Sequence, residues 1–198
     1  MARRSDHSRD ELAALVLEAA RKIVVEEGAE AVTMRKMGAL IGYAPGSIYN
    51  AVGDLEAVLR QVNATTLTEM ADQLDAVMAA HVPGTLENAL AIAEKYVDFV
   101  LKNPRLWAAL LKQPPRPGEA VPESYSRPRA RLIEIVATAI APLFTDALAR
   151  QKAVVALWAA LQGVASLASG GNYEFFAGDI DSKEIARSIV RRYLTGTD

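Results

Sequence analysis

The sequence lacks the residue types and motifs on which most catalytic and metal sites are built. It contains no cysteine in 198 residues, which excludes a disulfide framework and a thiolate metal site. Its two histidines, His7 and His81, are far apart and belong to no H-E-x-x-H motif. No aspartate-rich calcium loop, glycine-rich phosphate loop or serine elbow is present. We therefore predict no metal, no cofactor and no enzymatic activity. An all-α enzyme that uses two inward carboxylates is the alternative.

Long apolar runs are missing as well. No segment approaches the ~20 consecutive apolar residues that a membrane-spanning helix needs. The first residues, Met-Ala-Arg-Arg-Ser-Asp-His, are not followed by the apolar stretch of a signal peptide. We therefore expect no contact with a membrane and a cytoplasmic location. A net charge of −2 also argues against nonspecific nucleic-acid binding by the whole molecule, so any attraction to DNA must be local.

Apolar residues recur at the spacing of helices along most of the chain. Hydrophobic residues make up 51% and charged residues 23% of the sequence, a balance typical of globular proteins. The periodic segments predict helices at residues 9–27, 33–40, 45–52, 54–81, 85–102, 104–111, 126–141, 146–169 and 182–194. The predicted fold is therefore all-α, with about nine helices. We place an N-terminal three-helix domain at residues 1–53 and a C-terminal helical bundle domain at residues 54–198.

Two of these helices are short and are joined by a tight turn. Thr33 is a good N-cap for the first, Gly42 ends it, and Pro45 suits the first position of the second. The buried faces are expected to hold Met34, Met37, Leu40, Ile41, Ile48 and Val52. Ser47, Tyr49 and Asn50 are then left on an exposed face of the second helix. A helix start with small residues and a polar face is what a DNA major groove accepts.

The charge around this helix pair also favours DNA. Residues 31–53 contain no Asp or Glu, although the chain has 24 acidic residues, and they include Arg35 and Lys36. The hydroxyls of Tyr43 and Tyr49 are able to donate to phosphate oxygens. An ordinary helical hairpin is the alternative. Before the first helix, Arg3 and Arg4 form either a basic arm for phosphate or a minor groove, or a merely solvated terminus.

Three motifs in this region resemble the DNA-binding segment of the TetR/AcrR family of transcriptional repressors. They are T-M-R-K-M at 33–37, G-Y-A-P-G-S-I-Y-N at 42–50 and G-D-L-E-A-V-L at 53–59, and the resemblance spans roughly residues 8 to 62. It implies phosphate contacts by Thr33, Tyr43 and Tyr49, and positions near bases for Pro45, Gly46, Ser47 and Asn50. The chain departs from the family at Ala51, where an aromatic residue is common, and at Leu55, where a lysine is common. The predicted DNA-binding residues are Thr33, Arg35, Lys36, Tyr43, Ala44, Pro45, Gly46, Ser47, Tyr49 and Asn50.

The last two long helices predict an interface between two copies of the chain. Residues 146–169 are nearly uncharged after Lys152 and contain many alanines together with Gly163, and such small residues permit close helix packing. A helix that is apolar on nearly all sides needs other apolar surfaces on two sides, one from its own domain and one from a partner. We therefore expect helices 146–169 and 182–194 to form a homodimer through a four-helix bundle. A core that is wholly intramolecular is the alternative.

The C-terminal domain is also the expected site of a small-molecule effector. Several aromatic and apolar residues come from helices that should converge, and they would suit an apolar or aromatic ligand. The predicted ligand-binding residues are Met70, Tyr96, Phe99, Trp107, Leu110, Tyr125 and Trp158. Residues 113–124, with four prolines in twelve residues, predict a long loop beside them. By the family resemblance, the chain is expected to be a homodimeric repressor that such an effector releases from a pseudo-palindromic operator. A helical small-molecule-binding protein without DNA binding is the alternative.

Overall fold

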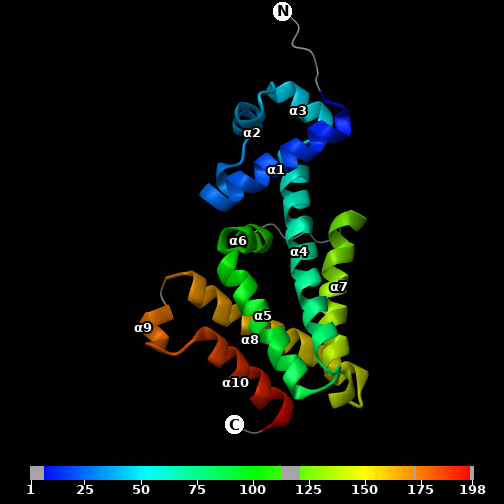
Figure 1. The fold of residues 1–198 in the computed structure, drawn as a ribbon, viewed down its shortest axis with the longest axis vertical. Coiled ribbons are helices and arrows are strands. Elements are labelled where there is room, and N and C mark those ends of the chain that lie inside the picture. The colour runs from blue at the N-terminus through cyan, green and yellow to red at the C-terminus, as the bar shows by residue number, and fades with distance from the viewer. Residues whose placement is uncertain (1–6, 113–120, 172, 197–198) are drawn as a thin grey trace, which may run out of the picture. The chain divides into compact units, whose positions relative to one another are not determined.

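All regular structure in the described part of the chain is helical (Figure 1). The computed structural model describes residues 7–112, 121–171 and 173–196. The helices are α1 (Arg9–Glu27), α2 (Met34–Ile41), α3 (Pro45–Val52), α4 (Leu55–Ala80), α5 (Leu86–Lys102), α6 (Pro104–Lys112), α7 (Glu123–Ile140), α8 (Ala147–Ser169), α9 (Tyr173–Ala177) and α10 (Ser182–Thr195). Two 3-10 turns are η1 (Ala29–Ala31) and η2 (Ala141–Leu143). The all-α prediction is confirmed.

Several helix starts are set by side-chain caps that the sequence carries. The capping box ahead of α1 is formed, because the Ser8 backbone N–H donates to Glu11 Oε2 at 2.7 Å and the Glu11 backbone N–H donates to Ser8 Oγ at 3.3 Å. The Ala149 backbone N–H donates to Asp146 Oδ2 at 2.7 Å at the start of α8. Each cap satisfies backbone donors that a helix start leaves without an intrahelical partner.

The first of two compact units consists of residues Met1–Thr66 and Arg105–Tyr125. Its core is made by α1, α2 and α3 together with the first part of α4 and α6, through residues such as Met37, Ile48, Val62 and Leu106. This division differs from the predicted boundary after residue 53. The first turns of α4 and the apolar face of α6 complete the core of the three-helix bundle, and a boundary drawn at the end of α3 leaves them out.

Backbone contacts also tie α6 to α1 within this unit. The Arg105 guanidinium donates to the carbonyl oxygen of Val25 at 2.9 Å and to that of Glu26. A cation at these last carbonyls of α1 is favourable because the helix C-terminus carries partial negative charge. Lys112, at the end of α6, pairs with Glu30. The hydrogen bond from Lys112 and, to a smaller extent, the positive charge of that side chain lower the pKa of the Glu30 carboxyl.

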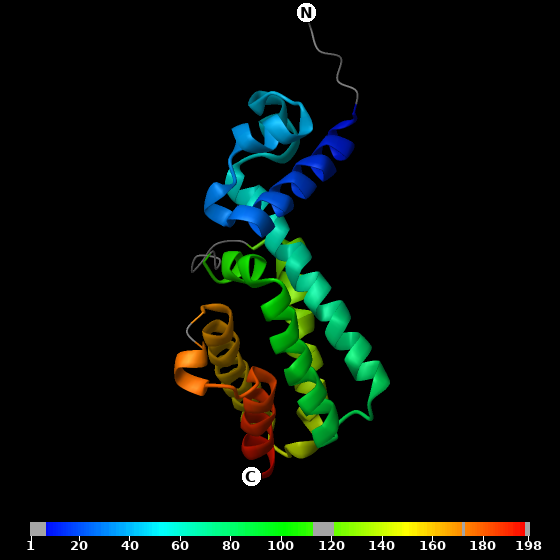
Figure 2. The same cartoon turned by 60° about the vertical axis from the view of Figure 1, so that its left-hand side comes forward.

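The second compact unit consists of residues Leu67–Pro104 and Ser126–Asp198. Helices α5, α8 and α10 pack against one another in it, as both views show (Figures 1 and 2). Its buried core includes Leu90, Val97, Phe99, Leu157 and Val190. The three helices therefore share one apolar core, with α5 buried along most of its length.

Ion pairs at the edge of this core join helices that are distant in the sequence. Lys183 Nζ of α10 lies 3.3 Å from Asp98 Oδ1 of α5, and Arg187 pairs with Glu94. On another pair of helices, Arg131 of α7 bonds to Asp72 Oδ1 of α4 at 2.7 Å and also to Asp75. Each of these ion pairs joins two different helices, so the spacing of residues within one helix could not have predicted it.

The start of α7 and the presence of α9 differ from the prediction. Helix α7 begins at Glu123 and contains Pro128 in its sixth position, so the predicted loop ends earlier than expected. Pro128 has no backbone N–H, so the carbonyl oxygen of Ser124 receives no helical hydrogen bond from it, and proline inside a helix favours a local bend. Residues 113–120 of that predicted loop lie outside the described residues. Helix α9 has five residues, too few for apolar periodicity to indicate it.

Helix α8 corrects the expectation that no segment could span a membrane. Its 23 residues have a mean hydropathy of 1.4 in their most apolar window, which is long and apolar enough by length and composition alone. Many of these residues are alanine, so the helix does not stand out as a run of large apolar side chains. Core helices of water-soluble proteins pass the same test, and one third of this window is buried inside the chain.

Candidate nucleic-acid interface

The turn between α2 and α3 is built from one cap and a pair of backbone hydrogen bonds. Thr33 Oγ1 accepts the Lys36 backbone N–H at 3.1 Å and so starts α2 as predicted. Helix α2 ends at Gly42, whose φ of 78° lies in the left-handed region. The backbone N–H groups of Gly42 and Tyr43 both donate to the carbonyl oxygen of Gly38, at 2.9 and 3.0 Å. The chain therefore reverses immediately after α2.

Gly38 makes this close reversal possible. A Cβ atom at this position would lie 2.5 Å from the Tyr43 carbonyl oxygen and 3.4 Å from Ile48 Cδ1. The first distance is shorter than any ordinary contact, and the atom that it meets is backbone. The absence of a side chain thus lets the turn fold back against α2 and brings α3 close to it.

The inner faces of α2 and α3 are mostly those predicted. Met34, Met37 and Ile48 are buried in the core of the first unit, and Ile41 and Val52 are half-buried. The prediction that Leu40 lies on the buried face is wrong, because 51% of its surface is exposed. Successive residues of a helix are about 100° apart, so a residue six positions after Met34 points to a different side.

The outer face of α3 is open to solvent. Tyr49 is 53% exposed and Asn50 is also exposed, while Ser47 is half-buried. Residues 44–46, at the start of the helix, are exposed and small, so little bulk stands in front of the α3 backbone. This is the arrangement that the sequence predicts for a helix that enters a major groove.

The two predicted cations of α2 have different surroundings. Arg35 is exposed, and among the described residues it forms no ion pair. Lys36 pairs with Glu27 at the end of α1. This ion pair was not predicted, because only residues 31–53 were considered for acidic side chains and Glu27 lies before that range. An exposed pair of this kind is weak, so a phosphate is able to compete with Glu27 for Lys36.

The hydroxyl of Tyr43 has a partner within the chain. Tyr43 Oη and His7 Nδ1 are 2.6 Å apart, and the two rings are 5.9 Å apart between centroids. His7 was not among the predicted site residues, since nothing in its local sequence points to Tyr43. A phosphate contact by Tyr43 must therefore share its hydroxyl with His7. The basic arm of Arg3 and Arg4 lies outside the described residues.

The seven predicted ligand-binding residues are divided between the two units. Trp107 and Tyr125 are buried and Leu110 is half-buried in the first unit, whereas Met70, Tyr96 and Phe99 are buried in the second. Trp158 is 50% exposed. It is therefore not part of the interior of a single chain, because it lies on the outer face of α8.

A polar chain in the second unit was not predicted. Tyr96 Oη donates to Gln162 Oε1 at 2.6 Å, and Gln162 Nε2 donates to Ser166 Oγ at 2.6 Å. It leads from the buried Tyr96 on α5 to the exposed Ser166 on α8. The signal in the sequence was Gln162 itself, an amide within an otherwise apolar stretch of helix.

Comparisons with known proteins agree on one family and one fold. The family model described as "Tetracyclin repressor-like, C-terminal domain" matches residues 89–193, more than half of the chain. The chain is 27% identical over 188 residues to the uncharacterized HTH-type transcriptional regulator YobS of Bacillus subtilis (strain 168), a match that covers 92% of this chain and 90% of that protein.

Two solved structures illustrate the shared fold. A protein of unknown function from Rhodococcus sp. RHA1 superposes with a TM-score of 0.78 at 18% identity, covering 98% of both chains. The transcriptional regulator FadR from Bacillus subtilis, in complex with stearoyl-CoA, superposes with a TM-score of 0.67 at 12% identity, covering 93% of this chain and 99% of that one. At these identities, the likeness demonstrates a common fold.

Proposed function

The chain belongs to the TetR family of transcriptional regulators, and on this basis we propose that it is a homodimeric repressor of a pseudo-palindromic operator. It is a regulator and not an enzyme. The observation that carries the proposal is the open polar face of α3, which begins with small residues and presents Tyr49 and Asn50 to solvent. In a dimer, two such helices would enter successive major grooves.

The proposed DNA contacts divide into two kinds. Thr33, Arg35, Lys36, Tyr43 and Tyr49 would contact phosphates, which position the protein on the duplex without reading its sequence. The proposed base-reading residues lie at and near the start of α3, namely Ala44, Pro45, Gly46, Ser47 and Asn50. Of the cations, Arg35 is the stronger candidate, because Lys36 has to leave Glu27 first. These contacts belong to the proposed DNA-binding domain, residues 1–53, which the first turns of α4 and α6 support.

The proposed dimer forms through α8 and α10. Large apolar side chains on the outer face of these helices are exposed in the single chain, namely Leu148, Val155, Trp158, Leu167 and Tyr193. The inner face of α8 is already occupied by the core of the second unit, through Leu157 and Leu161. An apolar helix covered on one side only is stabilised by a partner on the other side.

The proposed effector is a small apolar or aromatic molecule that binds in the C-terminal domain, residues 54–198. Support comes from the buried Tyr96 and Phe99 and from Gln162, which provides a polar end next to Tyr96. The stearoyl-CoA bound to the structurally similar FadR makes a long apolar effector reasonable. We propose that the dimer also has a conformer in which the distance between its two α3 helices does not match the spacing of the operator half-sites. An effector releases DNA only to the extent that it binds this conformer more tightly than the DNA-binding one. A regulator of this kind would act in the cytoplasm, without a membrane partner.

Operator binding is tested by mobility shift with DNA from upstream of the protein's own reading frame. We expect a retarded band whose affinity falls steeply with salt, because phosphate contacts release counterions. The double variant Arg35→Ala/Tyr49→Ala should lose the band. Arg35→Ala alone should lower the slope of log K against log salt by about 2, roughly 1 for each Arg35 of the dimer.

The matched control is Arg129→Ala, which removes an exposed arginine of α7 outside the proposed interface. It should bind the same DNA as the wild type does. If the wild type binds a small molecule but retards no fragment of its own upstream region, the alternative of a helical small-molecule-binding protein is correct. If Arg129→Ala weakens binding as much as Arg35→Ala, the proposed contacts are wrong.

A further inference from the structure

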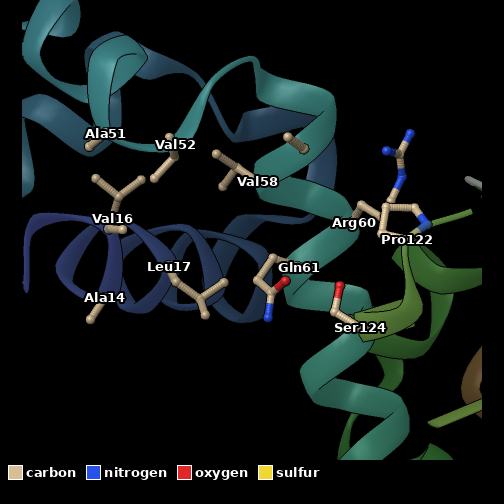
Figure 3. Close-up of a pocket in the computed structure, with 12 residues that line it drawn as sticks. Ala14, Val16, Leu17, Ala51, Val52, Val58, Arg60, Gln61, Pro122 and Ser124 are labelled. Carbon is tan, nitrogen blue, oxygen red and sulfur yellow. The ribbon is translucent and has the colours of Figure 1, made fainter. Parts of the chain in front are cut away.

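A hollow of about 450 Å³ lies within the first unit, lined by α1, α3, the start of α4 and residues that precede and begin α7 (Figure 3). Its apolar wall includes Val16 and Leu17 of α1, Val52 of α3 and Val58 of α4. Figure 3 shows Val16, Val52 and Val58 pointing from three helices into the space between them. The volume falls within the ~300–1,000 Å³ typical of small-molecule sites. None of the seven predicted effector residues lines this hollow.

The hollow exists because its wall is rich in alanine. Ala13 and Ala14 of α1, Ala51 of α3 and Ala57 of α4 all line it. An alanine in such a wall leaves open the space that a larger side chain would occupy. Position 51 is one at which the resemblance leads us to expect an aromatic residue, and Ala51 therefore removes a ring from this wall.

Polar side chains gather toward one end of the hollow. Figure 3 shows Arg60, Gln61 and Ser124 on the side away from Ala51. Arg60 Nη2 donates to Glu56 Oε1 at 2.9 Å, an i,i+4 pair whose carboxylate is 55% exposed. Such a pair is weak, so a ligand carboxylate is able to compete for the guanidinium. Gln61 and Ser124 add an amide N–H and a hydroxyl as further donors.

We propose that this hollow binds a small amphipathic carboxylate, with its apolar body against the alanine and valine wall and its carboxylate at Arg60. The site includes none of the seven predicted effector residues, and all of its lining residues belong to the first unit. A molecule bound there contacts Ala51 and Val52, the last residues of the helix that presents Tyr49 and Asn50. The protein therefore has a place where a metabolite touches α3 from its inner side.

The test uses the full chain with methyl-labelled valine and leucine, and follows proton–carbon NMR spectra during titration with octanoate. We expect saturable shifts of the Val16, Leu17, Val52 and Val58 methyl signals. Octan-1-ol, which has the same apolar body without the charge, should move the same signals with an affinity lower by on the order of tenfold. Arg60→Gln should reduce the octanoate affinity to that of octan-1-ol, whereas Arg129→Gln should leave it unchanged.

Filling the hollow should remove the site. Ala51→Phe is expected to abolish the shifts, and Ala14→Phe, at an exposed position of the wall, provides a second variant with less risk to folding. The control Ala108→Phe adds the same ring at an exposed alanine of α6 outside the hollow and should bind octanoate as the wild type does. The proposal is overturned if the four methyl signals do not shift saturably, or if both filled variants still bind. Equal affinity of Arg60→Gln and the wild type for octanoate would refute the carboxylate contact. No DNA is present in this assay, so its outcome is independent of operator binding.

Discussion

Gly38 is the residue on which the turn between α2 and α3 depends. The Cβ atom of Gly38→Ala would lie 2.5 Å from the Tyr43 carbonyl oxygen, so the turn or α3 must move. We expect this variant to lower the free energy of unfolding by about 1–3 kcal/mol, the usual range for overpacking. Urea denaturation followed by circular dichroism measures the change. DNA binding should fall as well, because α3 is displaced.

Gly46→Ala is the matched control for this prediction. Gly46 lies in α3, and a Cβ atom there meets nothing within 4 Å. Alanine in a helix should leave stability unchanged or raise it by up to ~1 kcal/mol. Equal destabilisation by the two substitutions would mean that the close approach at Gly38 does not limit the turn.

Among the contacts between elements, Asp98 connects α5 to α10. It accepts a hydrogen bond from Lys102 at 2.8 Å within α5, and Lys183 of α10 lies 3.3 Å away. Lys102 first and then Lys183 lower the pKa of the Asp98 carboxyl, against the opposing effect of partial burial. A lowered pKa in the folded state stabilises the protein above the ordinary aspartate pKa, and this contribution is lost as the pH falls through the folded pKa.

We therefore expect Asp98→Asn to be less stable than the wild type at pH 7, with a difference that shrinks below about pH 4. Thermal unfolding of both proteins across this pH range tests the prediction. Asp179→Asn is the control, because Asp179 is exposed and has no ion pair among residues 7–112, 121–171 and 173–196. A difference between Asp98→Asn and the wild type that persists unchanged at low pH would show that the ion pairs do not cause it.

For the molecule as a whole, the proposed repressor requires two copies of the chain. Val155 of α8 is 59% exposed and belongs to the apolar face that we assign to the dimer. Val155→Glu should place a charge in that interface, where an unpaired charge costs several kcal/mol. We expect the variant to sediment as a monomer at micromolar concentration, while the wild type sediments as a dimer.

Val82→Glu is the matched control for the dimer prediction. Val82 is an exposed valine between α4 and α5, away from α8 and α10 in the sequence, and the same substitution there should leave the dimer intact. A monomeric wild type would refute the proposed arrangement of two half-sites. Dissociation by both variants would place the interface elsewhere.

The features that could be predicted from the sequence are those that depend on neighbouring residues. Caps such as Ser8 and Thr33, the glycine that ends α2 and the apolar periodicity of the helices act within a few positions, so their effects are readable along the chain. The family resemblance rests on the same local motifs. For this reason the all-α fold and the exposed face of α3 were predictable from the amino-acid sequence.

The contacts between distant residues could not be predicted in this way, because they depend on packing. The pairing of Lys36 with Glu27, the contact of Tyr43 with His7 and the hydrogen bond from Tyr96 to Gln162 join separate elements. The hollow lined by alanines from three helices is also a property of packing, since each alanine alone is an ordinary helix former. Such contacts depend on the positions of whole helices, which are set by the many weak apolar contacts of the core and not by any local pattern.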